Sequence, residues 1–429
     1  MGGIRRLGVA VSAMAAMAAV PAAAQARDMF VPNYQSQTVS VVNTTTNTVI
    51  HTITFGNGGG PSLATVTPDG KTAYVVEYDS NKVIPIHVAT FKKEAAIRLP
   101  GGKSGNPIAV AVTPDGKQAY VAERGAGTLV PVNLTNHSAG PPISVGAADS
   151  LAIGADGEAA YVGINNQQGG PTDEVVPVST ATNTAGSPIA VPAPDSLAAA
   201  PNGKTVWAQG AEGDLIPIRT ATNTTGTPIA GLSTVAPSGL AISPSGRMAY
   251  WSDYGEADVY PVNLSTRTVG SAISVGPGPE HPALTPNGKT LYTSNAGDDS
   301  LTPVFTATKK AGSAITVGSE PGQLGIVPNQ GPKATFTSTT SGLKVTLNAA
   351  ASSDSDGKVV KYVWRFGDGK SQTTGNATTS HTYSKAGSYT VTLTVTDNEG
   401  CSTTQVFTGQ TMYCNGSDAA RTSHTAHVT

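Results

Sequence analysis

The sequence predicts an all-β protein, and three observations lead to that prediction. The phrase TPDGKTAYV, which begins at Thr67, returns in altered form, and its turn glycine recurs every 41 to 46 residues, as in four-stranded propeller blades. Apolar and polar residues alternate, as in KVIPIHVAT, and no long stretch has helical spacing. Turn formers are abundant, with 49 glycines and 30 prolines, while only 13% of residues are charged. The recurring glycines are Gly70, Gly116, Gly157, Gly203, Gly246 and Gly288.

Each repeat predicts a sheet of four strands. A small apolar strand such as IAVAVTP leads into a Pro-Asp-Gly or Pro-Asn-Gly turn. Proline presets φ and glycine tolerates positive φ there, so the next strand, such as AYVVEY, folds back as a hairpin. Two further strands complete the unit. A lone sheet of this kind would leave an apolar face in water, so the sheets are expected to stack around an axis.

The count of strand types predicts seven blades. The AYV-type strand occurs seven times, beginning at residues 29–31, and the small apolar strand also occurs seven times but is offset along the chain. The last apolar strand, residues 323–328, is therefore expected to become the innermost strand of the blade begun by residues 29–55. Such closure removes an exposed sheet edge. We expect a seven-bladed β-propeller over residues 27–331, closed by the N- and C-terminal strands of the repeat region.

The repeat TPDGKTAYVVEYDSNKVIPIHVAT resembles the YVTN family of β-propeller repeats, which occurs in secreted and surface-layer proteins of bacteria and archaea. The resemblance covers about residues 29–330. Trp207 and Trp251 depart from the usual Tyr-Val pattern. The resemblance implies the fold rather than an activity, because related propellers carry diverse ligands.

After residue 331 the period stops and a second module is expected. SYTVTLTVTD is an alternating strand that places Tyr389, Val391, Leu393 and Val395 on one face. A tryptophan, Trp364, precedes the glycine turn of WRFGDG, which fits a small β-sandwich. The motifs Trp364–Gly369, His381-Thr382-Tyr383 and Gly387-Ser388-Tyr389 closely resemble the PKD domain, an Ig-like sandwich. The resemblance implies a spacer or a weak protein or carbohydrate binder.

The chain ends bear on location and on domain limits. Residues 1–26 read as a signal peptide, with Arg5 and Arg6 before an Ala/Val/Met run that is short for a membrane span. In an exported protein, Cys401 and Cys414 are expected to form a local disulfide. The sandwich is expected over residues 332–414, followed by a disordered polar tail over residues 415–429. The expected location is secreted, cell surface or cell wall, with no transmembrane segment in the mature chain.

Composition and motifs exclude several functions. The formal net charge of −2, without a clustered basic face, argues against nucleic acid as a partner. There is no Gly-x-Ser-x-Gly nucleophile motif and no His-x-His or His-Glu-x-x-His pair to hold zinc. Glu280 and His281 lie in a loop that leads into an inner strand, near the expected mouth of the channel. His281 is therefore a candidate for a ligand or catalytic role, although a loop histidine beside proline is more often simply solvated.

Carboxylates are the main candidate ligand residues. They follow the AYV-type strands, and a closed ring would gather them on one face, where a single-sign field favours cations or basic partners. The same residue types are also preferred by hairpin turns, which is the competing interpretation. The loop over residues 165–173 is longer than the equivalent loops of the other repeats and is the best candidate for a specific contact. The predicted ligand face contains Glu77, Asp79, Glu123, Asn165, Asn166, Asp173, Glu212, Asp214, Asp253, Asp258, Glu280, His281 and Asp298.

A calcium site is possible in the second module. Asp354 and Asp356 are spaced two apart before Gly357, as in calcium loops, although the twelfth-position Glu of an EF-hand is missing. The PKD resemblance adds Asp397 as a third ligand. Turn capping is the alternative role of these carboxylates. No cofactor is expected to be required.

The sequence therefore favours an exported recognition protein. The propeller would serve as a platform for a surface glycan, peptide or protein, and the PKD-like module as a spacer or accessory binder. One alternative is a propeller enzyme, lactonase-like or a cofactor-dependent oxidoreductase, whose active residues converge from several blades. Another is a structural surface-layer component. The oligomeric state is not predicted.

Overall fold

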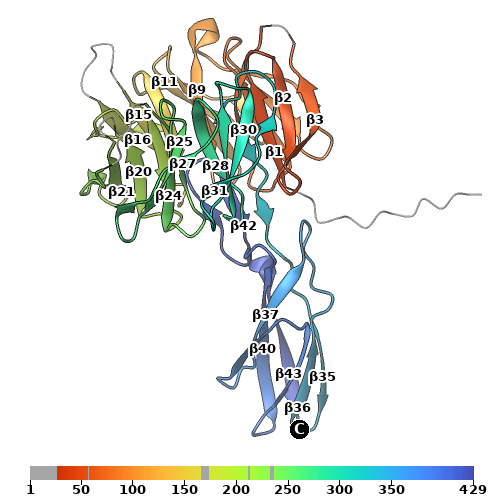
Figure 1. The fold of residues 1–429 in the computed structure, drawn as a ribbon. Helices are drawn as coiled ribbons and strands as arrows, with labels where there is room; N and C mark the ends of the chain where they lie inside the picture. The colour runs from red at the N-terminus through yellow and green to blue at the C-terminus, as the bar shows by residue number, and fades with distance from the viewer. Residues whose placement is uncertain (1–26, 57, 166–172, 211–212, 232–235) are drawn as a thin grey trace, which may run out of the picture.

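The computed structural model describes residues 27–56, 58–165, 173–210, 213–231 and 236–429 (Figure 1). The predicted signal peptide, residues 1–26, lies outside the described residues. Within the described residues the protein is all-β. The exceptions to strands and loops are two single 3-10 turns, η1 (Gly102–Ser104) and η2 (Asp418–Ala420). A repeat domain of separate sheets stands above an elongated sandwich (Figure 1).

The described part of the repeat domain contains seven sheets, each built from an inner, a second, a third and an outer strand. The inner strands are β4 (Pro61–Val66), β9 (Pro107–Val112), β14 (Ala148–Ile153), β19 (Ser196–Ala199), β23 (Pro237–Ile242), β28 (Pro279–Leu284) and β33 (Gly325–Ile326). The second strands are β5 (Thr72–Glu77), β10 (Gln118–Glu123), β15 (Ala159–Ile164), β20 (Thr205–Gln209), β24 (Met248–Asp253), β29 (Thr290–Asn295) and β1 (Asp28–Asn33).

The third strands are β6 (Lys82–His87), β11 (Thr128–Asn133), β16 (Glu174–Ser179), β21 (Leu215–Arg219), β25 (Asp258–Asn263), β30 (Ser300–Phe305) and β2 (Thr38–Asn43). The outer edge is one strand in the first sheet, β3 (Thr48–Thr54), and short pieces elsewhere. These pieces are β7 (Lys92–Lys93), β8 (Ile97–Arg98), β12 (Ser138–Ala139), β13 (Ile143–Ser144), β17 (Thr184–Ala185), β18 (Ile189–Ala190), β22 (Thr224–Thr225), β26 (Thr268–Val269), β27 (Ile273–Ser274), β31 (Lys310–Ala311) and β32 (Ile315–Thr316).

The inner strands contact one another in sequence order, and β33 contacts both β28 and β4. The late strand β33 pairs antiparallel with the first strand β1, with Met29 opposite Ile326. This pairing is the one predicted from the offset of the strand types. The sequence signal for it was the unpartnered apolar strand at residues 323–328.

The repeated tyrosine of the AYV-type strand links one sheet to the next. Each of these tyrosines is buried, and its hydroxyl reaches the hairpin between the third and outer strands of the following sheet. Tyr161 donates to Asn223 Oδ1 at 3.1 Å, and Asn223 has a left-handed φ of 52°. Tyr292 of the seventh sheet donates to Asn47 Oδ1 of the first sheet at 2.5 Å, and Asn47 has a φ of 56°. The seventh and first sheets are thus joined by the same contact as consecutive sheets.

The sandwich consists of two sheets. One contains β35 (Thr337–Ser341), β36 (Lys344–Asn348) and β39 (Thr378–Thr382); the other contains β37 (Val359–Arg365), β38 (Ser371–Thr374), β40 (Gly387–Asp397) and β43 (Arg421–Val428). The alternation predicted for residues 388–397 is confirmed, because Val391, Leu393 and Val395 are fully buried. They pack around Trp364, which is also fully buried.

The C-terminal tail corrects the sequence interpretation. Residues 415–429 were expected to be disordered, yet residues 421–428 form β43, which pairs along most of β40. Ala426 and Val428 are buried in the sandwich core. The strand was missed because only these two apolar residues alternate with its Thr, Ser and His. The sandwich therefore extends beyond the predicted boundary at residue 414.

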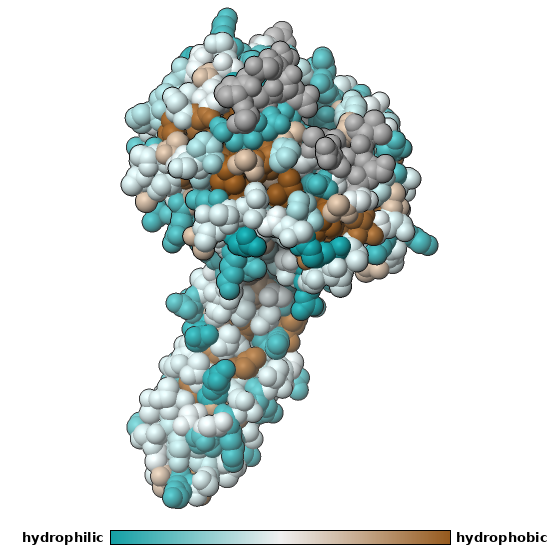
Figure 2. All heavy atoms as spheres, turned by 90° about the vertical axis from the view of Figure 1, so that its left-hand side faces the viewer, coloured by the Kyte–Doolittle hydropathy of each residue, from teal (hydrophilic) through white to brown (hydrophobic). Residues whose placement is uncertain are grey.

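A third, small sheet lies where the two domains meet. It contains β34 (Asn329–Gln330), β42 (Met412–Asn415) and β41 (Val406–Phe407). The predicted Cys401–Cys414 disulfide is present beside it. In the space-filling view the sandwich surface is mostly hydrophilic, whereas apolar patches lie on the flank of the repeat domain (Figure 2).

Candidate functional site

Antiparallel pairing defines two faces of the repeat domain. Pro61, at the start of an inner strand, lies opposite Glu77 at the end of the second strand, and Pro107 lies opposite Glu123 in the same way. Loops after second strands and loops before inner strands therefore share one face, here called the mouth face. The Pro-Asp-Gly turns lie at the opposite end of these strands, on the lower face. The sandwich is joined to the lower face, where Gln330 Nε2 donates to Pro68 O at 3.0 Å.

A cavity of about 480 Å³ opens on the mouth face among loops from five of the seven sheets. Its position fits the prediction that the loops leading into the inner strands surround a central entrance. We call it the mouth pocket. It is lined by Tyr34, Ser62, Leu63, Tyr78, Pro107, Ile108, Arg124, Asp149, Glu280, His281, Glu320, Pro321 and Gly322.

One side of the mouth pocket carries a network of polar groups. Arg124 Nη1 lies 3.1 Å from Asp149 Oδ1, and the Asp149 side chain is 14% exposed. Asn165 connects two carboxylates, because its backbone N–H donates to Asp149 and its Nδ2 donates to Asp195. Burial raises the pKa of Asp149 and of Asp195, and the negative charge of Asp173 adds to both effects. The positive charge of Arg124 opposes the rise at both carboxylates.

A pair of aromatic rings forms another part of the mouth pocket. Tyr34 and Tyr78 are packed edge to face with ring centroids 6.1 Å apart. The Tyr34 hydroxyl donates to Asp79 Oδ1 at 3.1 Å, which fixes the ring. Tyrosine combines an apolar ring with a polar tip, a combination that suits partly wet binding surfaces.

His281 is the one strained residue that lines the pocket on an inner strand. Its φ is +40°, within an irregularity of the β28–β29 pairing. A left-handed conformation costs a non-glycine residue about 1–3 kcal/mol and recurs at functional sites. His281 Nε2 lies 3.7 Å from Glu280 Oε2, and the two side chains are about one-third exposed. Burial lowers the pKa of His281, and the Glu280 carboxylate opposes that effect.

Three predicted ligand-face acids are buried, which corrects the sequence interpretation. Glu77, Glu123 and Asp253 are at most 8% exposed, and their carboxylates accept hydrogen bonds from nearby loops. Glu123 accepts from Asn81 Nδ2 at 2.5 Å and from the backbone N–H of Gly101 at 3.1 Å. These acids lie at the ends of second strands and fix the neighbouring mouth-face loops. Because they are buried, they are not accessible to a ligand. For these three acids the structure favours the competing interpretation, a structural role in the turns.

The remaining predicted residues are distributed differently. Glu280 and His281 line the mouth pocket, and Asp79 borders it through Tyr34. Asn165 is buried and Asp173 is half-buried, beside the polar network of Asp149. Asp214, Asp258 and Asp298 lie outside the pocket lining, and Asp298 accepts a hydrogen bond from Ser300 at 2.6 Å. Asn166 and Glu212 lie outside the described residues.

Sequence reasoning missed several pocket residues. Asp149, in AADSLAI, lines the pocket, and Asp195, in APDSLAAA, belongs to the adjoining polar network; both occupy the position at the start of an inner strand that Glu280 has in GPEHPAL. Aligning the repeats at the start of the inner strand would have identified them. Tyr34 and Glu320 carry no comparable signal, because their proximity depends on the pairing of β33 with β1.

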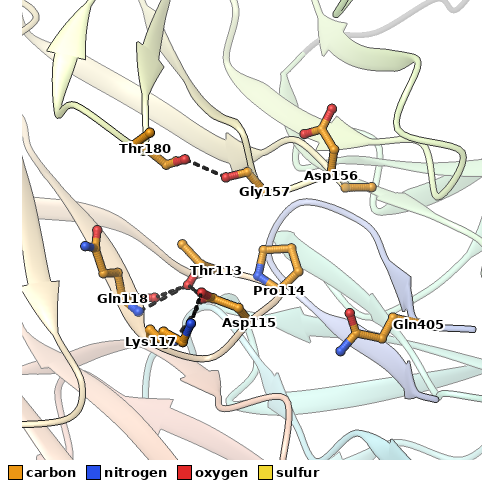
Figure 3. A pocket seen from close by; sticks show the side chains of 11 residues that line it. Thr113, Pro114, Asp115, Lys117, Gln118, Asp156, Gly157, Thr180 and Gln405 are labelled. Atoms are coloured by element: carbon orange, nitrogen blue, oxygen red, sulfur yellow. Dashed lines mark hydrogen bonds and ion pairs between the residues drawn. The ribbon is translucent and has the colours of Figure 1, made fainter. Parts of the chain in front are cut away.

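A second cavity, of about 380 Å³, lies on the lower face (Figure 3). Its polar groups are used within the turns, because Thr113 Oγ1 donates to Asp115 Oδ1 at 2.6 Å and the backbone N–H of Lys117 donates to the same oxygen. Asp69 makes the same contacts with Thr67 and Lys71. A pattern repeated from sheet to sheet reflects the fold. The mouth pocket is therefore the better candidate site.

The three carboxylates predicted as calcium ligands lie near Arg27 in the structure. Asp354, Asp356 and Asp397 lie close enough for burial and the other two carboxylates to raise the pKa of Asp354 to about 7. Asp354 Oδ2 and Asp356 Oδ1 are buried without a hydrogen-bond partner, which suits a cation. However, Arg27 Nη1 lies 2.5 Å from Asp356, and Arg27 Nη2 is paired with Glu399. The Arg27 guanidinium thus places a positive charge beside Asp356 and Glu399.

Asp397 is also engaged by the protein. It accepts hydrogen bonds from Asn329 Nδ2 at 2.9 Å and from the backbone N–H groups of Glu399 and Cys401. In the part of the chain that the structure describes, no group of three or more His, Cys, Asp or Glu side chains is arranged to hold a metal ion. Within the same part, no helix is long and apolar enough to cross a membrane.

The sandwich is identified by comparison with known proteins. Residues 329–411 match the family model of the PKD domain, as the sequence resemblance implied. Over 73 residues, or 17% of this chain, the sequence is 51% identical to pre-pro-metalloprotease PrtV of Vibrio cholerae, of which the match covers 8%. It is 36% identical over 90 residues to a microbial collagenase of Vibrio alginolyticus, covering 20% of this chain and 11% of that protein. The chain thus spans about a tenth of these relatives.

Solved structures resemble a larger part of the chain. A putative 6-phosphogluconolactonase from Bacteroides uniformis aligns with a TM-score of 0.58 and 16% identity, covering 71% of this chain and all of that one. A protein of unknown function from Desulfotomaculum acetoxidans aligns with a TM-score of 0.59 and 15% identity, covering 70% and 98%. These likenesses concern the fold alone.

Proposed function

We propose that the seven sheets form a seven-bladed β-propeller of the YVTN type. Three features support this assignment. Inner strands follow one another in order, β33 lies beside β1, and the Tyr292–Asn47 hydrogen bond repeats the contact between consecutive sheets. A ring of this kind gathers the loops that make the mouth pocket.

We further propose that the protein is exported and binds a cell-surface or extracellular glycan, peptide or protein in the mouth pocket. The observation that carries this proposal is the combination of groups in one cavity, where the Tyr34–Tyr78 ring pair lies with the Arg124–Asp149 ion pair. Aromatic faces pack against sugar rings or methylene groups, and charged groups fix orientation. The PKD domain would act as a spacer or accessory binder that projects from the lower face, opposite the mouth face (Figure 1).

Glycan and peptide arrays probed with the full chain test this function. Arg124→Ala and Tyr78→Ala are expected to weaken binding about tenfold or more, as at other binding hot spots. Tyr254→Ala is the matched control, because Tyr254 is 46% exposed and follows β24 on the mouth face outside the pocket lining. Binding that survives both pocket substitutions, or that is lost in the control, would contradict the proposal.

A lactonase-like enzyme is the second candidate. It is favoured by the strained His281 beside Glu280 in the mouth pocket, where a histidine could move a proton. The assay is hydrolysis of 6-phosphogluconolactone and glucono-δ-lactone by the wild type and by His281→Ala. Turnover that disappears in the variant would support the enzyme, and no turnover above the spontaneous rate would exclude it for these lactones.

A further inference from the structure

The PKD sandwich contains a connection that is much longer than its strand order requires. β40 and β43 are antiparallel neighbours, with Thr394 opposite Arg421, so a short hairpin could join them. Instead, residues 398–420 separate the two strands, and this connection carries β41, β42 and the Cys401–Cys414 disulfide. We call residues 402–416 the plug segment.

The plug segment leaves the sandwich and enters the repeat domain from the lower face (Figure 1). Phe407 and Met412 are at most 3% exposed and pack in the core shared by the β9 and β14 sheets. Tyr413 packs in the core shared by the β23 and β28 sheets, and its hydroxyl donates to Ile242 O at 3.0 Å. These three side chains alone contact the lower ends of four sheets.

Backbone hydrogen bonds hold the tip of the plug segment, residues 408–410, against the inner strands. Ile153 N–H donates to Gly409 O at 2.8 Å, and Ala199 N–H donates to Thr408 O at 3.0 Å. Gly409 has a φ of +101°, and a Cβ at this position would lie 2.9 Å from Ala199 N. A side chain at residue 409 is therefore incompatible with the inserted conformation on two counts.

The tip lies directly below the mouth pocket. Gln410 Nε2 donates to Leu151 O at 2.7 Å, and Leu151 follows the pocket residue Asp149 by two positions on β14. Thr65 Oγ1 donates to Gln410 O at 3.3 Å, and Thr65 follows the pocket residue Leu63 by two positions on β4. Two residues of strand span about 7 Å.

A second glutamine fills the layer between the tip and the pocket. Gln323 is 6% exposed, and its Nε2 donates to Ala64 O and to Val110 O, each at 3.3 Å. These carbonyls belong to two different inner strands, β4 and β9. Two layers therefore cross the centre of the repeat domain below the mouth pocket. Gln323 forms the upper layer, and the tip of the plug segment forms the lower one.

We propose that the plug segment closes the centre of the repeat domain on the lower face and positions the floor of the mouth pocket. A ligand then enters from the mouth face alone, and the PKD domain takes part in shaping the site. The role of the floor in binding rests on the proposed function; the closure and the coupling of the two domains do not. The disulfide ties both ends of the plug segment and holds it in its inserted form.

Hydrogen exchange and calorimetry on the full chain test this proposal without a ligand. Gly409→Val is expected to expel the tip, to raise exchange at least about tenfold in residues 61–66, 107–112 and 148–153, and to split one cooperative thermal transition into two. Thr404→Ala, at an exposed position of the same segment, is the control and should behave as the wild type. Increased exchange confined to residues 402–416, with a single transition, would overturn the proposal.

Reduction of the wild type provides the second measurement, which needs no substitution. A phosphine reductant is expected to raise exchange in the plug segment and in the same inner strands. Exchange unchanged in those strands would count against the proposal. Array binding that survives the pocket substitutions, with the exchange results as expected, would reject the binding function and leave the plug proposal intact.

Discussion

Arg27 is expected to take the place of a metal ion at the junction of the two domains. Its side chain is 7% exposed and is surrounded by acceptors from the sandwich and the linker. Besides its two carboxylate partners, it donates to Pro328 O at 3.2 Å and to Asn329 Oδ1 at 2.5 Å. The carboxylates are themselves largely buried, with Asp356 at 10% and Glu399 at 17% exposure. Removing the guanidinium would leave these charges buried and unpaired.

The change Arg27→Ala should therefore lower the free energy of unfolding by about 3–5 kcal/mol, as when one partner of a buried ion pair is removed. With a urea slope of about 2 kcal/mol per M, the unfolding midpoint of the sandwich should fall by roughly 1.5–2.5 M. The same variant should gain a calcium response, because the carboxylates around Asp354 then lack their cation. Calcium bound to the folded variant would raise its free energy of unfolding, and the increase grows with the ratio of the free calcium concentration to the dissociation constant.

The assay is urea unfolding of the full chain, followed by circular dichroism, in EDTA and in 10 mM CaCl2. The wild type and Arg98→Ala, which changes an exposed arginine, should show the same midpoint in both buffers. Arg27→Ala should show a lowered midpoint that calcium partly restores. A wild type stabilised by calcium as much as Arg27→Ala, or an Arg27→Ala midpoint like that of the control, would refute the reasoning.

Three further predictions follow from single contacts. Because the folded pKa of Asp354, about 7, lies above its ordinary value of 3.8, its contribution to stability is full below pH 3.8 and is lost as the pH rises through 7; unfolding midpoints should show this slope, and Asp354→Asn should flatten it. Glu123→Ala should lower stability by about 1–3 kcal/mol in urea titrations, since Asn81 loses its acceptor; an unchanged midpoint would argue against the structural role. Truncation after residue 420 should abolish the cooperative unfolding of the sandwich, because β43 pairs with β40; a truncated chain with a wild-type transition would show that the tail is dispensable.

The repeat architecture was predictable because one local pattern recurs. The Pro-Asp-Gly turn and the AYV-type strand specify the same hairpin wherever they occur, and Tyr161 and Tyr292 make equivalent contacts. Strand alternation likewise predicted the buried face of β40. These features depend on residues close together in sequence.

Other features depend on contacts between distant residues and could not be predicted. The burial of Glu123 depends on Asn81 from the preceding sheet. The pairing of Arg27 with Glu399 joins the beginning of the described chain to the sandwich. The plug segment has the sequence of an ordinary polar loop with a few apolar residues, and only its partners in six sheets give it a role. A single sequence carries no signal for such partners.

Assembly of the mouth pocket depends on the late strand β33 completing the first sheet beside β1, because this pairing brings Glu320 and Pro321 next to Tyr34. A double variant, Met29→Cys with Ile326→Cys, tests this pairing directly, because the two residues are opposite each other across the β1–β33 pair. Opposed residues of antiparallel strands have Cα atoms about 4.5–5.5 Å apart, which suits a disulfide. Peptide mapping of the oxidised, monomeric variant should recover a peptide that links residues 29 and 326, with Cys401–Cys414 intact. Free thiols at both positions after oxidation, or links formed only between molecules, would contradict the account.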